Sequence, residues 1–212
     1  MLSEEPKWLR WGRMLQSIAQ TGSFYTENPY DKERYQQIIQ IAAEMIAEGS
    51  EFDAETVITL WADQFGPDTP KLDVRGAVIK DGTILLVQEV NDKLRWTLPG
   101  GWADPNESAS EATVREVFEE TGYHVTVNKL VALYDKAHQD HPPDMFSIQK
   151  AFFLCDFVDG EPKSSLETGE TRWFKENALP SNDELSLGRV NLAQLKIMFA
   201  HYHQRDLPAE FD

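Results

Sequence analysis

The first third of the chain has apolar residues at the spacing of amphipathic helices. A first helix is expected to end in the Thr-Gly-Ser run around Gly22. The pair Asn28-Pro29 predicts the start of a second helix, which should stop at Gly49, and Asp53 is placed to cap a third. The apolar positions that carry these patterns are Trp8, Trp11, Leu15, Ile18, Tyr35, Ile38, Ile39, Ala42, Met45, Ile46, Val57, Leu60, Trp61 and Phe65.

Residues 66–70 are rich in glycine and proline, which predicts a linker. Strand-forming sequence predominates after it. Asp81-Gly82 between two β-rich runs predicts a tight hairpin, and Asp159-Gly160 predicts a turn. Strands are expected at residues 74–79, 84–90, 96–98, 125–135, 146–157 and 172–174, and a final helix at residues 189–203.

This order of elements predicts a helical N-terminal domain at residues 1–68 and a mixed α/β domain at residues 69–212. Three short helices bury little apolar surface by themselves. They need another surface, which the α/β domain, a second copy of the chain, or both would supply. We therefore expect a homodimer, in which the N-terminal domain serves dimerisation or supports the substrate site.

Residues 101–123 contain the most informative helix of the chain. Ser108 with Glu111 forms a capping box, and Gly122 is a C-terminal stop signal. An inward apolar face is expected, while the opposite face is acidic because three glutamates recur at i, i+3 and i+4. The apolar face comprises Val114, Val117, Phe118 and Thr121, and the acidic face comprises Glu116, Glu119 and Glu120.

Three like charges on one helical face repel each other, and a divalent cation removes that conflict. Arg115 is one turn away from Glu111 and Glu119 and can hold a carboxylate in one rotamer. The alternative is an ordinary solvated acidic face. That alternative explains neither the Gly-Gly pair before the helix nor the Arg-Glu step inside it, so the sequence favours a metal site.

The spacing of these residues resembles the Nudix box. Eight positions match the pattern, and Tyr123 departs from it where a smaller aliphatic residue is usual. The resemblance implies an α/β/α sandwich with a mixed sheet over residues 72–205, preceded here by a small all-α domain. The matching positions are Gly101, Glu107, Arg115, Glu116, Val117, Glu119, Glu120 and Gly122.

The resemblance also implies the roles of individual residues. Magnesium, with manganese as a substitute, would be bound by the main-chain carbonyl of Gly100 and by the side chains of Glu116, Glu119 and Glu120. Arg115 would orient Glu116. In addition, Gly101 and Glu107 would lie at the substrate site, where Glu107 completes the polar network.

The general base is expected either within the box, at Glu116 or Glu119, or on a later loop, at Glu167 or Glu170. Solvated loop carboxylates are an equal alternative for the last two. The loop histidines His138 and His141 are candidates for substrate contact, but a structural or solvent-facing role is favoured over it. They are a weak metal pair, because no third nitrogen or sulfur ligand accompanies them. Trp8, Trp11, Tyr25 and Tyr30 can stack a nucleobase or act as core and interface residues.

Composition narrows the choice of partners and compartment. The formal net charge of -16 argues against nucleic-acid binding, which relies on clustered lysine and arginine. The first thirty residues lack an unbroken apolar core, which indicates neither a signal peptide nor a membrane anchor, so a cytoplasmic location is expected. The single cysteine, Cys155, is expected to be a buried strand residue.

The helical extension resembles the bacterial Nudix subgroup that includes CDP-choline pyrophosphatase and related UDP-X diphosphatases. This resemblance implies a metal-dependent pyrophosphohydrolase that cleaves a nucleoside diphosphate linked to another group into a nucleoside monophosphate and a phosphorylated partner. CDP-choline and nucleotide sugars such as ADP-ribose are the expected substrates. The alternatives are a noncatalytic ligand-sensing Nudix domain and a pyrophosphatase that removes oxidised nucleoside triphosphates.

Overall fold

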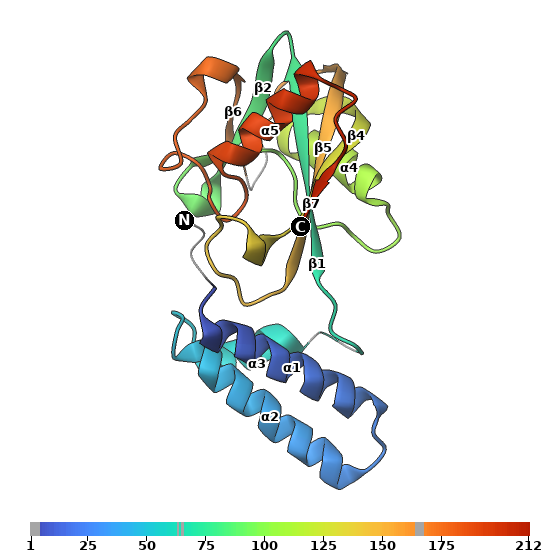
Figure 1. Cartoon of the computed structure of the whole chain (residues 1–212), viewed down its shortest axis with the longest axis vertical. Coiled ribbons are helices and arrows are strands. Elements are labelled where there is room, and N and C mark those ends of the chain that lie inside the picture. The colour runs from blue at the N-terminus through green and yellow to red at the C-terminus, as the bar shows by residue number, and fades with distance from the viewer. Residues whose placement is uncertain (1–4, 63, 65, 164–167) are drawn as a thin grey trace. The chain divides into compact units, whose positions relative to one another are not determined.

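The computed structural model describes residues 5–62, 64, 66–163 and 168–212 of the chain. The chain forms two compact units (Figure 1). One consists of residues 1–70 together with 143–147, and the other of residues 71–142 together with 148–212. No helix in the described ranges is long and apolar enough to cross a membrane.

The helical unit contains α1 (Lys7–Tyr25), α2 (Pro29–Ala47) and α3 (Ala54–Ala62). The predicted caps are confirmed: the side chain of Asn28 accepts a hydrogen bond from the Tyr30 main chain, and Asp53 accepts one from the Thr56 main chain. The caps fix where α2 and α3 begin, so that their apolar faces meet α1. The core of the unit comprises Leu9, Ala42, Ala43, Ile46, Val57 and Trp61.

The prediction that the first helix ends around Gly22 was wrong, because α1 continues to Tyr25. A Cβ atom at Gly22 would lie 2.3 Å from the ring of Tyr35, and one at Gly12 would lie 2.7 Å from Ile46. Both glycines therefore serve the close approach of α1 and α2. A sequence reading sees the poor helix propensity of glycine but not the neighbouring helix that requires it.

A segment distant in sequence completes the helical unit. The guanidinium of Arg13 donates to the main-chain oxygens of Asp144 and Phe146, at 3.1 and 3.2 Å. The side chains of Met145 and Phe146 pack against the helical core. Residues 143–147 thus belong by packing to the helices although they lie between two strands of the other unit.

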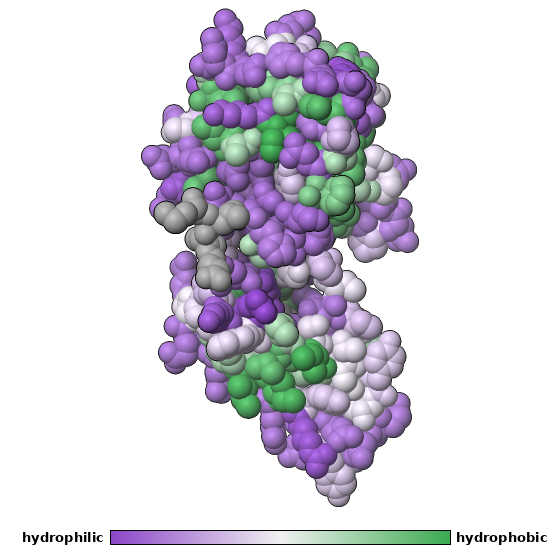
Figure 2. Space-filling view, in the orientation of Figure 1, coloured by the Kyte–Doolittle hydropathy of each residue, from purple (hydrophilic) through white to green (hydrophobic). Residues whose placement is uncertain are grey.

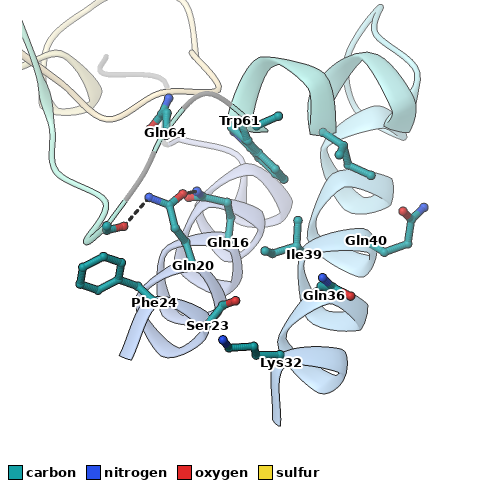
Figure 3. Close-up of a pocket in the computed structure, with 13 residues that line it drawn as sticks. Gln16, Gln20, Ser23, Phe24, Lys32, Gln36, Ile39, Gln40, Trp61 and Gln64 are labelled. Carbon is teal, nitrogen blue, oxygen red and sulfur yellow. Dashed lines mark hydrogen bonds between the residues drawn. The ribbon is translucent and has the colours of Figure 1, made fainter. Parts of the chain in front are cut away.

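On one side of the helical unit, α1, α2 and α3 border a groove of about 670 Å³ (Figure 3). Amide side chains line it beside Trp61. Gln16 donates to Gln20 at 2.6 Å, and Gln20 donates to the Gly66 main-chain oxygen at 2.7 Å. The second bond ties α1 to the segment that follows α3, and the first, within α1, orients the Gln20 side chain.

The second unit is a seven-stranded mixed sheet with the order β3-β2-β1-β5-β4-β7, in which β6 also pairs with β2. The β1–β5 and β4–β7 pairs are parallel, and the others are antiparallel. The hairpin predicted at Asp81-Gly82 is confirmed, since both residues have positive φ and join β1 to β2. The strands are β1 (Lys71–Lys80), β2 (Thr83–Glu89), β3 (Arg95–Thr97), β4 (Tyr123–Asp135), β5 (Ile148–Gly160), β6 (Thr168–Lys175) and β7 (Glu210–Phe211).

Two helices cover opposite faces of this sheet, α4 (Ala109–Thr121) and α5 (Leu192–His203), as Figure 1 shows. Each has its own core: Val117 of α4 packs with Val74 and Cys155, whereas Met198 and Phe199 of α5 pack with another set of strand residues. The burial of Cys155 is as predicted. The unit is therefore an α/β/α sandwich with a mixed sheet, preceded by a small helical region. Short 3-10 helices at Val90–Asp92, Lys136–His138 and Glu176–Ala178 complete it.

Three details of this unit differ from the prediction. The last helix begins at Leu192 and not at residue 189, because Asn191 and Gln194 form its capping box. No turn interrupts β5 at residues 159–160, since Gly160 pairs with Tyr123 of β4. Phe118 is 41% exposed and stacks on His124 instead of facing the core. In the last two cases a partner on β4 overrides the local signal, whereas the start of α5 is set by its own cap.

Replacing Gly12 with valine should destabilise the helical unit by about 1–3 kcal/mol, because overpacking of a close contact costs that much. The new side chain would meet Ile46, and the helices cannot separate without losing their core. Thermal unfolding followed by circular dichroism measures the effect. Gly188→Val is the control, since a Cβ atom there meets nothing within 4 Å. Equal stability of the two variants would contradict the close-approach role of Gly12.

Candidate active site

The acidic helix α4 has the ends that the sequence predicts. Ser108 and Glu111 form the capping box, and Gly122 ends the helix with a φ of 75°. These ends set the rotation of the helix, so its three glutamates lie in different environments. The Glu120 residue is 7% exposed, whereas the side chains of Glu116 and Glu119 are 15% and 58% exposed.

Arg115 connects the carboxylates of this segment. Its guanidinium lies 2.7 Å from Glu107, 2.8 Å from Glu116 and 3.2 Å from Glu119. It also donates to the main-chain oxygen of Trp102. The hydrogen bonds from Arg115 are the main reason that the pKa of Glu107 falls to about 2. Arg115 therefore holds three glutamate side chains in fixed orientations.

Glu120 is directed toward the turn that precedes the helix. Its carboxylate accepts a hydrogen bond of 2.9 Å from the Gly100 main-chain nitrogen. Burial raises the pKa of Glu120 to about 7, and burial also raises the pKa of Glu116. Both carboxylates therefore carry a desolvation cost as ions, and a bound cation would offset that cost.

Both glycines of the Gly-Gly pair are required by contacts. Gly100 has a φ of 144°, and a Cβ atom there would lie 2.0 Å from the Val74 oxygen. A Cβ atom at Gly101 would lie 2.9 Å from the Glu116 carboxylate. The turn runs alongside β1, with the Val74 nitrogen donating to the Gly101 oxygen and the Gly76 nitrogen to the Pro99 oxygen, both at 2.8 Å. The pair lets the main chain approach β1 and Glu116 closely.

The structure adds two charged residues that sequence reasoning missed. Arg75 on β1 is 5% exposed, and its positive charge opposes the rise of the pKa of Glu120 and Glu116 that burial causes. Glu89 at the end of β2 is also 5% exposed, raises the pKa of Glu120, and pairs with Arg189 at 3.1 Å. A signal existed for both, because an arginine and a glutamate stand in strands whose other residues are largely apolar.

The predicted loop residues lie in varied places. His138 is exposed, and Glu170 forms an ion pair with Arg172 at 2.7 Å. Glu167 falls outside the described residues. His141 is 6% exposed, and its ring nitrogens contact the Leu187 oxygen and the Gln194 side chain. The structure shows no contact between these residues and the glutamates of α4 within its described part, and their substrate roles stay predictions.

The donor set of the segment suits a hard cation, because it consists of carboxylate and main-chain oxygens. Glu116, Glu119 and Glu120 with the Gly100 carbonyl would hold such an ion. In the structure the glutamates hydrogen-bond to Arg115 or to Gly100. Within the described ranges, no three acidic, histidine or cysteine side chains are already gathered closely enough to form a metal cluster.

Comparison with known families and proteins identifies the fold and the chemistry. Residues 70–195 match the model of the NUDIX domain, and residues 6–61 match the model described as a UDP-X-like, N-terminal oligomerisation domain. The first match spans more than half of the 212 residues. The chain belongs to the Nudix family, and it is a pyrophosphohydrolase of that family, as the pattern at residues 101–123 predicts.

Similar proteins support the family assignment over the whole chain. The Bacillus subtilis protein named "Putative ADP-ribose pyrophosphatase YjhB" is 37% identical over 212 residues, which is 100% of both chains. The crystal structure of an ADP-ribose pyrophosphatase from Streptococcus suis is 36% identical, with a TM-score of 0.61, and the match covers 68% of this chain and 100% of that one. The crystal structure of a UDP-X diphosphatase is 27% identical with a TM-score of 0.61, and covers 97% of this chain and 98% of that one.

The environment of His141 predicts a dependence of stability on pH. Burial is the main cause that lowers the pKa of His141 from 6.5 to about 4. The unfolded chain takes up a proton near pH 6.5 and the folded chain does not, so stability falls as pH drops from 6.5 to 4, by up to about 3 kcal/mol.

Glutamine at position 141 has a donor and an acceptor but does not titrate, so His141→Gln should flatten this part of the stability curve. Urea unfolding at pH 7, 5.5 and 4.5 measures the slope. His138→Gln is the control, because His138 is exposed. If stability fell equally with pH in His141→Gln and the wild type, His141 would not be the cause of the pH dependence.

Proposed function

We propose that the chain is a metal-dependent pyrophosphohydrolase that cleaves the diphosphate of a nucleoside diphosphate linked to another group. The observation that carries this proposal is the arrangement of α4. Arg115 orients Glu107, Glu116 and Glu119, while Glu120 is buried against the Gly100 turn. A site with this much negative charge needs a cation before it can accept a diphosphate.

Each residue of the site has a chemical task in this proposal. Glu116, Glu119, Glu120 and the Gly100 carbonyl hold magnesium, with manganese as a substitute. When bound, the metal polarises the phosphate and lowers the pKa of a coordinated water. Arg115 keeps Glu116 and Glu119 in position, and Glu107 shares its guanidinium. The base is Glu119 or Glu116 within the box, or, later in the chain, Glu167 or Glu170. Glu170 was expected on a loop but lies on β6.

ADP-ribose is the substrate that we place first. Two similar proteins are named as ADP-ribose pyrophosphatases, and one of them matches this chain over its full length. Their sequence identities to this chain, 37% and 36%, exceed the 27% of the UDP-X diphosphatase. CDP-choline and other nucleotide conjugates remain candidates. The products are a nucleoside monophosphate and a phosphorylated partner. Retention of all the box carboxylates favours hydrolysis over ligand sensing.

A substrate screen tests this proposal. Purified protein with magnesium is given ADP-ribose, CDP-choline, a UDP-sugar and an oxidised nucleoside triphosphate, and the released monophosphate and phospho-product are identified by mass spectrometry. Turnover of the conjugates supports the proposal. Preference for the triphosphate would favour nucleotide cleansing, and binding without turnover would favour a sensor.

Glu120→Gln should lower kcat by about two to three orders of magnitude, as losses of single charge-stabilising groups do. Glutamine keeps the shape and can still accept from Gly100, so the thermal unfolding midpoint should change little. Steady-state kinetics with magnesium, and with the metal removed by EDTA, give the comparison. Glu55→Gln, on the helix α3 of the other unit, is the control. Wild-type activity in Glu120→Gln would refute its role as a ligand.

We also propose that residues 1–68 form a dimerisation domain for the hydrolase domain at residues 69–212. Figure 2 shows hydrophobic side chains gathered over α1 and α2. Trp11, Met14 and Ile18 on α1 are 52%, 50% and 59% exposed, and Ile41 on α2 is 53% exposed. An equivalent face on a second copy would cover these residues and close a four-helix bundle, as in a two-fold symmetric interface.

A charge in this face should separate the dimer. Ile18→Asp puts an unpaired carboxylate into the proposed interface, so the variant should run as a monomer in light scattering at concentrations where the wild type is a dimer. Leu60→Asp is the control, because Leu60 is similarly exposed on α3, outside the α1–α2 face. A wild-type monomer, or a dimer unaffected by Ile18→Asp, would contradict the proposed face. The cytoplasmic location stays a prediction.

A further inference from the structure

Three charged residues are buried together in the sheet, next to the turn that precedes the acidic helix. Asp73 and Arg75 lie on β1 and Lys150 lies on β5, and their exposed fractions are 4%, 5% and 2%. Asp73 pairs with the Arg75 guanidinium at 2.6 Å and with the Lys150 ammonium. The parallel register sets Asp73 beside Lys150 directly. The two cations share one carboxylate, so the group has a surplus of one positive charge.

A buried ion triad is a poor means of stabilising a fold, because desolvation of the charges offsets their attraction. Apolar side chains of similar volume would serve packing equally well. The pKa of Asp73 lies well below its usual range: burial alone would raise it, and the two cations overcome that effect. Burial lowers the pKa of Lys150 to about 8, which is still above neutral pH. At pH 7 the triad therefore carries a surplus of positive charge, which must be balanced elsewhere.

The negative carboxylates of α4 balance that surplus positive charge. Arg75 acts electrostatically on both Glu116 and Glu120, which are themselves largely buried. The Nε and Nη2 atoms of Arg75 donate to the Asp73 carboxylate, and the remaining Nη1 atom donates to the Leu98 oxygen at 3.2 Å. The fork geometry of arginine is needed for this double contact, and a lysine has no such fork.

Arg75 also stands at the centre of the contacts that hold the Gly-Gly turn. Its neighbours in β1, Val74 and Gly76, donate from the main chain to Gly101 and Pro99. Its own side chain adds the bond to Leu98. The same turn presents the Gly100 nitrogen to Glu120. Three successive residues of β1 thus donate hydrogen bonds to three residues of the turn, Leu98, Pro99 and Gly101.

We propose that Arg75 is a positioning residue of the metal site: held by Asp73 and Lys150, it fixes the turn at residues 98–101 and provides the counter-charge that keeps Glu116 and Glu120 in place for the cation. The residue touches neither substrate nor metal in this role. The proposal rests on the metal-dependent function above and extends it to a layer of residues beneath the ligands.

Two variants test this role. Arg75→Lys keeps a positive charge beside Asp73 but loses the fork, and Arg75→Gln loses the charge as well. Manganese binding to the substrate-free protein is measured by electron paramagnetic resonance, and kcat and KM are measured at saturating magnesium. Arg205→Gln is the matched control, because Arg205 is a half-exposed surface arginine with one carboxylate partner, Asp156.

We expect Arg75→Lys to weaken manganese binding or lower kcat by about 10- to 100-fold, the usual loss when a residue supporting a metal ligand is changed. KM should change less than twofold, and Arg75→Gln should lose more than Arg75→Lys. The control should match the wild type. Circular dichroism and the unfolding midpoint, without metal, establish that each variant is folded, and Arg75→Lys decides the matter if Arg75→Gln does not fold.

Several results would overturn the proposal. Folded Arg75→Lys and Arg75→Gln with wild-type manganese affinity and kcat would show that the guanidinium is dispensable. A raised KM with unchanged kcat and manganese affinity would make Arg75 a substrate contact. Failure of Arg75→Lys to fold would assign the group to packing alone. A wild-type protein that binds no manganese and hydrolyses no conjugate would instead refute the proposed function itself, which separates the two failures.

Discussion

The contact between the Gly100 nitrogen and the Glu120 carboxylate is the constraint on which the rest of the site depends. It joins a helix, a turn and, through the turn, the strand β1. A buried carboxylate is costly unless donors and cations surround it. The main chain of the turn supplies a donor from one side, and Arg75 supplies charge from the sheet. The turn can occupy that place only because Gly100 and Gly101 have no side chains.

Charge in the hydrolase unit is arranged in layers around this contact. Arg115 binds Glu107, Glu116 and Glu119, and Arg75 acts electrostatically on Glu116 and Glu120 from the sheet. Lys150 and Asp73 support Arg75 from within the core. A strongly acidic chain thus uses a few cations at its functional centre, where low polarity makes each of them count for more.

Local signals were reliable where a residue acts on its own neighbours in sequence. The caps of α2, α3 and α4 and the hairpin at Asp81-Gly82 occur as predicted, because each is closed by bonds within a few residues. The errors at Gly22 and Gly160 have one cause. A glycine that permits a close contact between elements looks, in sequence, like a glycine that ends one.

The caps and the spacing of Glu116, Glu119 and Glu120 were sufficient to predict the helix and its acidic face, because helical periodicity places i, i+3 and i+4 on one face. The resemblance of the same segment to the Nudix box indicated the family. Tertiary structure decided which of these glutamates is buried and which is exposed. It also brought Arg75 and Glu89 to them from separate strands, since strand pairing joins residues that no local pattern connects. The assignment of residues 143–147 to the helical unit likewise depends on packing alone.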